Sequence, residues 1–501
     1  MAGGFLQYHE PSIVQILIVV SFFCSSLAEW LSAKILRAGI IGQIAVGIIY
    51  GVPLANILVH EWQETFLVLG YIGLILIIFE GGLTARLDLL KQNFLLSIIG
   101  AATGVLFPIG LSYLLLFLGF GYGAVETFII GAALSATSLG TTFAVISSAS
   151  RSVDLSQTRA GTVLVSAAVI DDVTGLVMSS VIHDLGSISD GGSANLGWVI
   201  GRPILASTLM AILTPLLTKF VFAPIFRRYI ERAFAAYDHL SNIVLMVVIL
   251  CGFISIAAYA GTSVLFGAFL AGTFLTYLPS KHAEGPFVVM SREEGEKNRD
   301  KSPTFVHTFE CYLMAVQEYL MAPLFFASIG FAIPFVSLWT GAAIWRGIVY
   351  TLLMVFSKLI VGIWIPIWDL LSRPKDAHLS RSASSISDPP TTSRSWTASL
   401  PAALLLGCAM VARGEIGLLI VQIGYNNTSY VSESGFLTAI WAILLNTLVG
   451  PIAVGLLVKM KGTEIGRGPW GYRMLLNIGM GPKGVPMWRW DGAACRRALW
   501  N

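Results

Sequence analysis

Apolar stretches of about 20 residues recur along almost the whole of this chain, and they limit what it can fold into. A stretch of that length crosses a bilayer as an α-helix, because a helix satisfies its backbone polar groups without water. Only 12% of the 501 residues are charged, whereas a soluble domain carries roughly 25%. The sequence therefore predicts an all-α, polytopic integral membrane protein, and soluble fold classes are excluded.

Thirteen such stretches can be counted, and the boundary between the eighth and ninth rests only on Ala260-Gly261-Thr262. Two longer polar intervals, 280–310 with mixed charge and 372–398 rich in Ser, Pro and Thr, are expected to be solvated loops. The predicted spans are 12–33, 38–58, 64–84, 94–120, 125–148, 158–183, 196–222, 239–260, 261–279, 311–336, 341–370, 399–424 and 434–458.

The distribution of the 31 lysines and arginines predicts the orientation of the chain. Nearly all of them fall on one side if the N-terminus is outside or lumenal and the C-terminus is cytoplasmic, as the positive-inside rule requires. The loops 280–310 and 372–398 and the short tail 464–501 would then be cytoplasmic. We expect no cleaved signal peptide and no nucleotide-binding domain in the tail, and the charge balance implies no nucleic-acid partner.

Two adjacent aspartates, Asp171 and Asp172, lie near the middle of one predicted span. A single charge there costs at least about 2.5–3.5 kcal/mol on insertion scales, and two neighbouring carboxylates also repel each other. Neighbouring residues on a helix point about 100° apart, so the two carboxylates cannot face the same partner. One can pair with a cation on another helix, for which Lys358 is the obvious candidate, while the other faces an aqueous cavity.

A second group of charges, Arg413 and Glu415, is flanked by glycines within the predicted span 399–424. Glycines around a charged pair indicate a broken helix whose ends point at an ion, although small residues also permit close helix packing. A matching break is predicted in Ser135-Ala-Thr-Ser-Leu-Gly-Thr-Thr142. The two breaks lie in the fifth and twelfth spans, which predicts a 6+1+6 inverted repeat with two broken, crossing helices.

Seven short motifs in order along residues 12–458 resemble the cation:proton antiporter superfamily, in the branch of NapA- and NhaA-type sodium/proton antiporters and Kef-type potassium systems. The motifs are Phe79-Glu-Gly-Gly-Leu83, Ala136-Thr-Ser-Leu-Gly140, Val169-Ile-Asp-Asp-Val173, Phe266-Gly-Ala-Phe-Leu-Ala-Gly272, Pro323-Leu-Phe-Phe-Ala-Ser-Ile-Gly330, Ser357-Lys-Leu-Ile360 and Arg413-Gly-Glu-Ile-Gly417.

The resemblance implies a transmembrane antiporter domain over residues 1–463, without cofactors, which forms a homodimer. Its core helices would lie at about 94–183 and 341–458, and its dimerisation helices at about 12–84 and 196–336. It also implies that Asp172 is the main ligand for the cation and the proton, and that Asp171 exchanges a salt bridge with Lys358. Thr137 and Ser138 would line the crossing of the broken helices.

The chemistry expected of such a site is exchange rather than catalysis, so the chain is not predicted to be an enzyme. A carboxylate in a medium of low dielectric constant holds a proton tightly, so a proton and an alkali cation compete for it. Carboxylate, hydroxyl and carbonyl oxygens suit hard cations, which favours Na⁺ or Li⁺, with K⁺ as the alternative. Exchange of this kind serves pH homeostasis, and it is electrogenic if Lys358 also releases a proton.

The sequence argues against three other functions. An intramembrane aspartyl protease needs aspartates on different helices that share a proton, whereas these are adjacent. A channel needs no inverted repeat. A non-transporting sensor of antiporter ancestry is disfavoured because Asp172 and Lys358 are both present.

Overall fold

Helices make up the secondary structure of the computed structural model, which describes residues 12–23, 25–36, 38–85, 93–138, 158–189, 196–230, 238–278, 305–371 and 396–471. Within these ranges there is no strand, so the expected all-α fold class is confirmed. The first helices are α1 (Ile13–Phe22), α2 (Ser25–Leu36), α3 (Gly39–Tyr50), α4 (His60–Thr84), α6 (Phe94–Ser112), α7 (Ala124–Ser135), α9 (Arg159–Ser189), α10 (Leu196–Leu217) and α11 (Ala223–Ile225).

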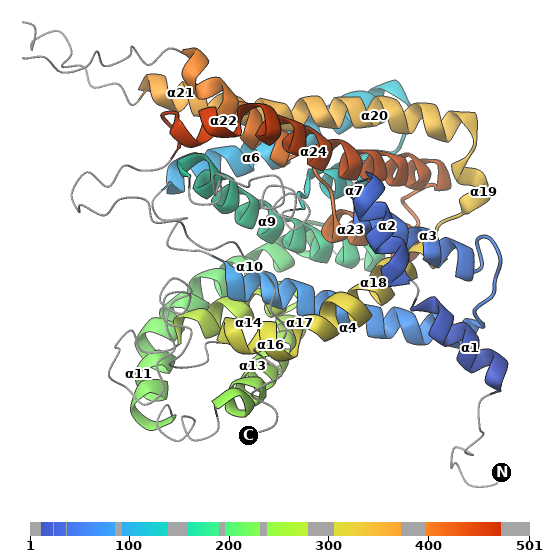
Figure 1. The fold of residues 1–501 in the computed structure, drawn as a ribbon, viewed down its shortest axis with the longest axis horizontal. Coiled ribbons are helices and arrows are strands. Elements are labelled where there is room, and N and C mark those ends of the chain that lie inside the picture. The colour runs from blue at the N-terminus through green and yellow to red at the C-terminus, as the bar shows by residue number, and fades with distance from the viewer. Residues whose placement is uncertain are drawn as a thin grey trace, which may run out of the picture.

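The later helices complete the bundle in Figure 1, in which the axes of α4, α20 and α24 run in roughly the same direction. They are α13 (Asp238–Ala260), α14 (Val264–Tyr277), α16 (Phe305–Tyr312), α17 (Met314–Val316), α18 (Ala322–Phe331), α19 (Phe335–Leu338), α20 (Gly341–Leu359), α21 (Trp364–Leu371), α22 (Trp396–Ala409), α23 (Glu415–Asn427) and α24 (Glu433–Arg467). Short π-helical turns η1 (Tyr113–Gly119), η3 (Thr218–Phe222), η4 (Phe226–Ile230) and η5 (Gln317–Met321) and the 3₁₀ turn η6 (Ile360–Ile363) extend or link them.

Nine helices in the described ranges are long and apolar enough to cross a membrane. Four shorter apolar helices, namely α3, α7, α14 and residues 398–409 of α22, fall in four further expected stretches. A polytopic membrane protein is thereby confirmed, while the count of thirteen spans stays a prediction. The weakly supported boundary between the eighth and ninth stretches is present, because Gly261 adopts a φ of 79° between the end of α13 and the start of α14.

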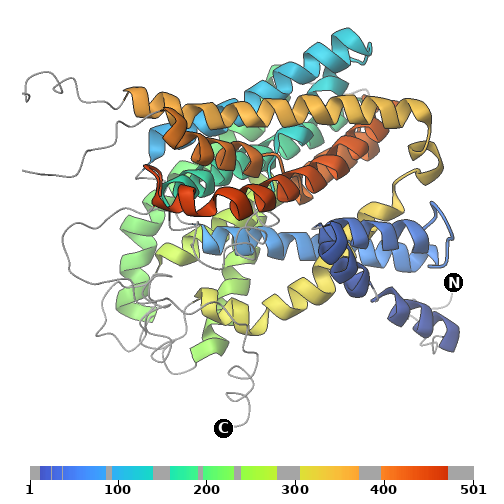
Figure 2. The same cartoon turned by 45° about the horizontal axis from the view of Figure 1, so that its top comes forward.

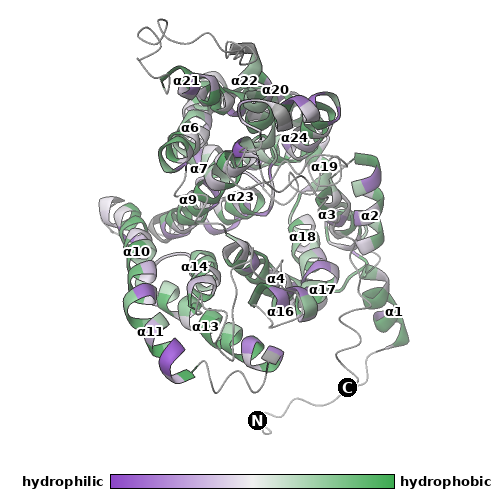
Figure 3. Cartoon of the chain, turned by 60° about the vertical axis from the view of Figure 1, so that its left-hand side comes forward, coloured by the Kyte–Doolittle hydropathy of each residue, from purple (hydrophilic) through white to green (hydrophobic). Residues whose placement is uncertain are grey.

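The helices pack as two groups. One, the α4 group, contains α1–α4, α13, α14 and α16–α18; the other, the α20 group, contains α6, α7, α9 and α19–α24, and α10 contacts both. The two groups occupy opposite sides of the molecule in Figures 2 and 3, and apolar residues dominate both.

Glycines bring backbones into close contact inside each group, as is common between membrane helices. In the α4 group, a Cβ on Gly70 would lie 2.7 Å from Phe325 Cα, and one on Gly73 would lie 2.6 Å from the Met321 carbonyl oxygen. In the α20 group, a Cβ on Gly450 would lie 2.6 Å from the Ala412 nitrogen. Within each group, therefore, some neighbouring helices contact one another directly through their backbones.

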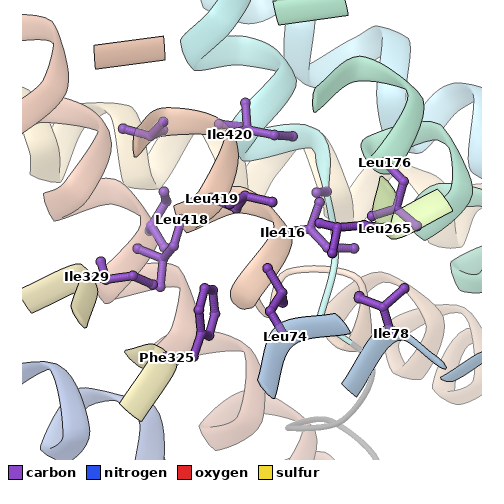
Figure 4. Close-up of a cluster of buried hydrophobic side chains, with 14 of the residues drawn as sticks. Leu74, Ile78, Leu176, Leu265, Phe325, Ile329, Ile416, Leu418, Leu419 and Ile420 are labelled. Atoms are coloured by element: carbon purple, nitrogen blue, oxygen red, sulfur yellow. The ribbon is translucent and has the colours of Figure 1, made fainter. Parts of the chain in front are cut away.

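Branched aliphatic and aromatic side chains fill the space between the two groups (Figure 4). Helix α23 contributes most of one side of this apolar layer, and α4, α14 and α18 form the other. A hydrogen bond of 3.5 Å from Gln422 Nε2 to the Ile329 carbonyl also joins α23 to α18. The side chains that define the apolar layer are Leu74, Ile78, Leu176, Leu265, Phe325, Ile329, Ile416, Leu418, Leu419 and Ile420.

The structure differs from the predicted loops in two places. Helix α16 begins at Phe305, within the expected loop 280–310, and buries Phe305 and Phe309, one turn apart on the same face. That expectation was wrong for these residues because the charged residues before them dominated the composition. The intervals 279–304 and 372–395 lie outside the described residues.

The second difference lies at the start of the predicted tail. Helix α24 continues to Arg467, past the expected boundary at 463, and Trp470 is only 1% exposed. Trp470 Nε1 donates to Asp369 Oδ2 at 2.8 Å, and the Arg159 guanidinium lies 4.3 Å from the centre of the indole ring. The backbone nitrogen of Ala160 donates to the Trp470 carbonyl at 3.0 Å. This segment is thus attached to the first turn of α9, the helix that carries both aspartates.

Candidate functional site

Two extended segments meet in the α20 group, one after α7 and the other between α22 and α23. Helix α7 ends at Ser135, and Ala136 is already extended. The nitrogen of Ser138 donates to the Ala412 carbonyl at 2.9 Å, which binds the first segment to the second. A Cβ on Gly414 would lie 2.5 Å from Ser138 Oγ, so a glycine is needed for the close approach. Residues 139–142 of the predicted first break lie outside the described residues.

Lys358 lies at this crossing with no exposed side-chain surface. Its Nζ donates to the Ser135 carbonyl at 2.6 Å, to Thr137 Oγ1 at 3.0 Å and to Asp171 Oδ2 at 3.1 Å. All three ammonium hydrogens therefore have acceptors. The structure brings together Lys358 and Asp171, which the sequence paired, on helices α20 and α9.

Asp171 is fully buried, and its two oxygens have different surroundings. Oδ2 receives the Lys358 ammonium and a short hydrogen bond from the Thr137 hydroxyl. Oδ1 has no hydrogen-bond partner among the described residues. A buried unpaired acceptor is costly, so Oδ1 is available to a proton, a water molecule or a cation.

Asp172 is half-buried and differs from its neighbour. No side chain or backbone group of the described residues donates a hydrogen bond to its carboxylate, whereas Asp171 is held by two. The charges that act on it are those of Glu415 and Asp171, which repel it, and of Lys358, which attracts it. In the part of the chain that the structure describes, the site thus holds three carboxylates, those of Asp171, Asp172 and Glu415, and two cationic side chains, those of Lys358 and Arg413, so positive charge is in deficit.

Arg413 and Glu415 are the remaining charged residues at the crossing. Arg413 lies near the C-terminal end of one helix, and Glu415 lies at the N-terminal end of another. Arg413 is fully buried, and its Nη1 donates to the Ala136 carbonyl at 2.9 Å, beyond the C-terminal end of α7. Its Nε and Nη2 lack partners among the described residues. Glu415 is the first residue of α23. Cations near helix C-termini and anions at N-termini are the favourable arrangement with the helix dipole.

Three residues that the sequence did not single out also shape the site. Ser112 and Tyr350, both buried, share a hydrogen bond of 2.6 Å between α6 and α20. Gly104 on α6 leaves room for the ammonium, because a Cβ there would lie 3.4 Å from Lys358 Nζ. For Ser112 and Tyr350, the only signal in the sequence was that Tyr350 lies two helical turns before Lys358 in the same predicted span. Nothing in the sequence marked Gly104.

These features define a polytopic membrane protein with buried charges at broken helices, an arrangement found in secondary transporters. The chain belongs to the family described as sodium/hydrogen exchanger, transmembrane, which it matches over residues 18–460. The expected resemblance to cation:proton antiporters is thereby confirmed, and the family is one of transporters rather than enzymes.

Individual relatives cover nearly the whole chain at low identity. The chain is 25% identical to a Na⁺/H⁺ antiporter of Enterococcus hirae over 441 residues, covering 87% of this chain and 95% of the relative. It is 23% identical to the Na⁺/H⁺-K⁺ antiporter GerN of Bacillus cereus over 439 residues, covering 87% and 93%. Among solved structures, the sodium proton antiporter MjNhaP1 of Methanocaldococcus jannaschii superposes with a TM-score of 0.57 at 18% identity, covering 89% of this chain and 97% of that one. The last likeness shows the shared fold.

Proposed function

We propose that this protein is a monovalent cation/proton antiporter that exchanges Na⁺, or Li⁺, for H⁺ at Asp172. The observation that carries the proposal is the contrast between the two aspartates. Asp171 is held by Lys358 and Thr137, whereas Asp172 is half-buried beside them without a hydrogen bond from the described residues. A carboxylate in that position is free to take either a proton or an alkali cation.

Competition for this one carboxylate accounts for obligatory exchange. Asp172 that holds neither ligand adds its charge to those of Asp171 and Glu415, and moving an uncompensated charge past lipid is costly. A bound proton or cation removes that charge, so only the loaded site crosses. Transport in each direction then requires a ligand, without ATP and without covalent chemistry.

Lys358 is the proposed coupling residue. If a cation that enters the site displaces its ammonium from Asp171, Lys358 releases a proton in the same cycle, and more protons than cations move. Exchange is then electrogenic. Support for this role is the geometry of the ammonium, which is bonded to Asp171, to Thr137 and to the end of α7 at once.

We assign the expected division of labour to the two helix groups. The α20 group would be the moving core that carries Asp172, and the α4 group would form the dimerisation domain of a homodimer. The apolar layer between them (Figure 4) is suited to sliding, because dispersion contacts are not directional. We retain the orientation expected from the lysines and arginines, with the N-terminus outside or lumenal and the C-terminus cytoplasmic.

Potassium is the alternative substrate. The relative GerN, which is named a Na⁺/H⁺-K⁺ antiporter, covers 87% of this chain at 23% identity. Carboxylate oxygens accept either ion, and the radius of the cavity around Asp172 decides between them. The ion therefore has to be measured.

The test uses sealed proteoliposomes that contain a pH-sensitive dye and an imposed proton gradient. Pulses of Na⁺, Li⁺ and K⁺ are compared for the wild type, Asp172→Asn and the matched control Glu433→Gln, whose carboxylate is exposed at the start of α24. We expect Na⁺ or Li⁺ to dissipate the gradient in the wild type and the control but not in Asp172→Asn. If no cation moves protons at any pH from 6 to 9, the proposal is wrong and a sensor becomes the better account.

A further inference from the structure

A second group of charged residues lies in the α4 group, away from the helix crossing. It consists of Glu29 on α2, Gln43 on α3 and Glu318 on η5. Gln43 Nε2 donates to Glu29 Oε2 at 2.6 Å. Ser26 Oγ on α2 donates to the Tyr319 carbonyl at 3.4 Å, which brings η5 and its Glu318 next to α2. The transport mechanism proposed above uses none of these residues.

The amide of Gln43 is the observation that points to a missing ligand. Its side chain is only 2% exposed, and its Oε1 has no hydrogen-bond partner. The nitrogen must face Glu29, because a carboxylate can accept but cannot donate. The unpartnered oxygen belongs to the same amide, so it lies beside the carboxylate. A buried acceptor without a donor costs about 1–3 kcal/mol.

The Oε1 of Gln43 and the carboxylate oxygens of Glu29 and Glu318 are all acceptors. No lysine, arginine or histidine of the described residues forms a salt bridge with Glu29 or Glu318. Both glutamates lie in predicted spans, where an unpaired charge is expensive. The carboxylate of Glu29 also packs against the first residue of α3, since a Cβ on Gly39 would lie 3.4 Å from its Oε1. The N-terminal end of a helix favours a carboxylate that stays charged.

The turn η5, which carries Glu318, also contacts α4 on its other side. The neighbouring Gln317 donates its Nε2 to Glu80 on α4 in a short hydrogen bond. The π-helical turn η5 is thereby attached to α4 through Gln317 and to α2 through the Tyr319 carbonyl. Isolated π-helical turns often occur at functional sites.

We infer that Glu29, Glu318 and the side-chain oxygen of Gln43 form a second binding site for a singly charged cation, separate from Asp172. Carboxylate and amide oxygens are the ligands of hard alkali cations. The same acceptors would also hold a primary ammonium, such as the head group of phosphatidylethanolamine. The shared chemistry is one positive charge between two carboxylates and an amide oxygen.

Binding of ²²Na⁺ to the purified full-length protein, in detergent without amine lipids, tests the inference. An Asp171→Asn/Asp172→Asn background removes the proposed transport site. We expect saturable Na⁺ binding to persist in that background and to weaken about tenfold or more with Glu29→Gln or Glu318→Gln. Glu61→Gln, which removes an exposed carboxylate at the start of α4, is the matched control and should leave binding unchanged.

A second arm distinguishes the two sources of charge. Phosphatidylethanolamine or phosphatidylcholine is added to the same variants, and the thermal unfolding midpoint is measured. If only the ethanolamine lipid stabilises the protein, and only with Glu29 and Glu318 intact, the cation is a lipid amine. If neither Na⁺ binding nor stabilisation by phosphatidylethanolamine changes in Glu29→Gln or in Glu318→Gln, the second site does not exist. Failure of antiport in proteoliposomes would refute the proposed function and leave this measurement unaffected.

Discussion

The Lys358 ammonium lies 3.1 Å from Asp171 Oδ2, and neither side chain has any surface exposed. The attraction between them offsets the cost of burying two charges, so each charge depends on the other. The pair connects α20 to α9, and through Thr137 it also reaches the end of α7. Its loss should therefore affect the stability of the protein as well as transport.

The first prediction concerns this pair. Lys358→Gln leaves a buried carboxylate without its cation and should destabilise the protein by about 3–5 kcal/mol. Asp171→Asn/Lys358→Gln removes both charges and should recover most of that loss. Thermal unfolding of the four proteins in a double-mutant cycle measures the coupling. If the loss of stability in the double variant equals the sum of the losses in Asp171→Asn and Lys358→Gln, the pair has no coupling energy.

The second prediction concerns the hydroxyl of Thr137, which contacts both Asp171 and Lys358. Thr137→Ala should lower stability by about 1–3 kcal/mol, because it leaves buried polar groups without a partner. Thr137→Ser keeps the hydroxyl and should stay near the wild type. Unfolding midpoints and the Na⁺ concentration for half-maximal exchange check both effects. A serine variant as impaired as the alanine variant would assign the role to the methyl group.

The third prediction uses two glycines one turn apart on α6. A Cβ on Gly104 would lie 3.3 Å from Met410 Cε and 3.4 Å from Lys358 Nζ, whereas a Cβ on Gly100 would meet nothing closer than 3.7 Å. Gly104→Ala should press on the ammonium and reduce exchange, while Gly100→Ala makes ordinary contacts and gains up to about 1 kcal/mol of helix propensity. Initial rates of proton flux compare the two. Equal rates would exclude crowding of Lys358.

The fourth prediction concerns Trp470, which links the end of α24 to Asp369 and to the first turn of α9. Trp470→Ala removes a large buried ring and should destabilise the protein by about 3–5 kcal/mol. Trp470→Phe keeps the stacking with Arg159 but loses the hydrogen bond to Asp369, so a loss of about 1 kcal/mol is expected. Thermal unfolding measures both, and cleavage after Arg159 by trypsin reports detachment of the segment. Unchanged cleavage in Trp470→Ala would mean that the ring does not hold α9.

The sequence predicted the charged residues of the site well, because intramembrane charges are few and each is costly. Helix geometry required the two aspartates to face different partners, and the resemblance to the antiporter superfamily assigned Asp171 to Lys358, the pair that the structure shows. The sequence could not find Gly104 or the pair of Ser112 and Tyr350, because hydropathy does not give the rotation of one helix against another. Residues far apart in the chain meet there only through packing.

Burial outside the apolar stretches was also missed. Phe305 and Phe309 lie next to a long charged interval, and Trp470 lies between glycines and basic residues, so their surroundings indicated loops. Each is buried through contacts with distant segments. The mean hydropathy of a sequence window does not reveal a single buried aromatic residue that holds a segment against the rest of the protein.

The glycine contacts divide the molecule mechanically. Inside each helix group several helices approach so closely that a Cβ added at the contacting glycine would overlap a neighbouring backbone atom. Across the apolar layer the contacts in Figure 4 are instead between apolar side chains, and the Gln422 hydrogen bond to the Ile329 carbonyl also crosses it. If the α20 group moves during transport, as proposed, this layer is the surface along which it would slide. The Lys358–Asp171 pair lies on one side of this layer, and Glu29 and Glu318 lie on the other. Sliding along the layer would therefore change the distance between these two charged centres and leave the contacts within each centre intact.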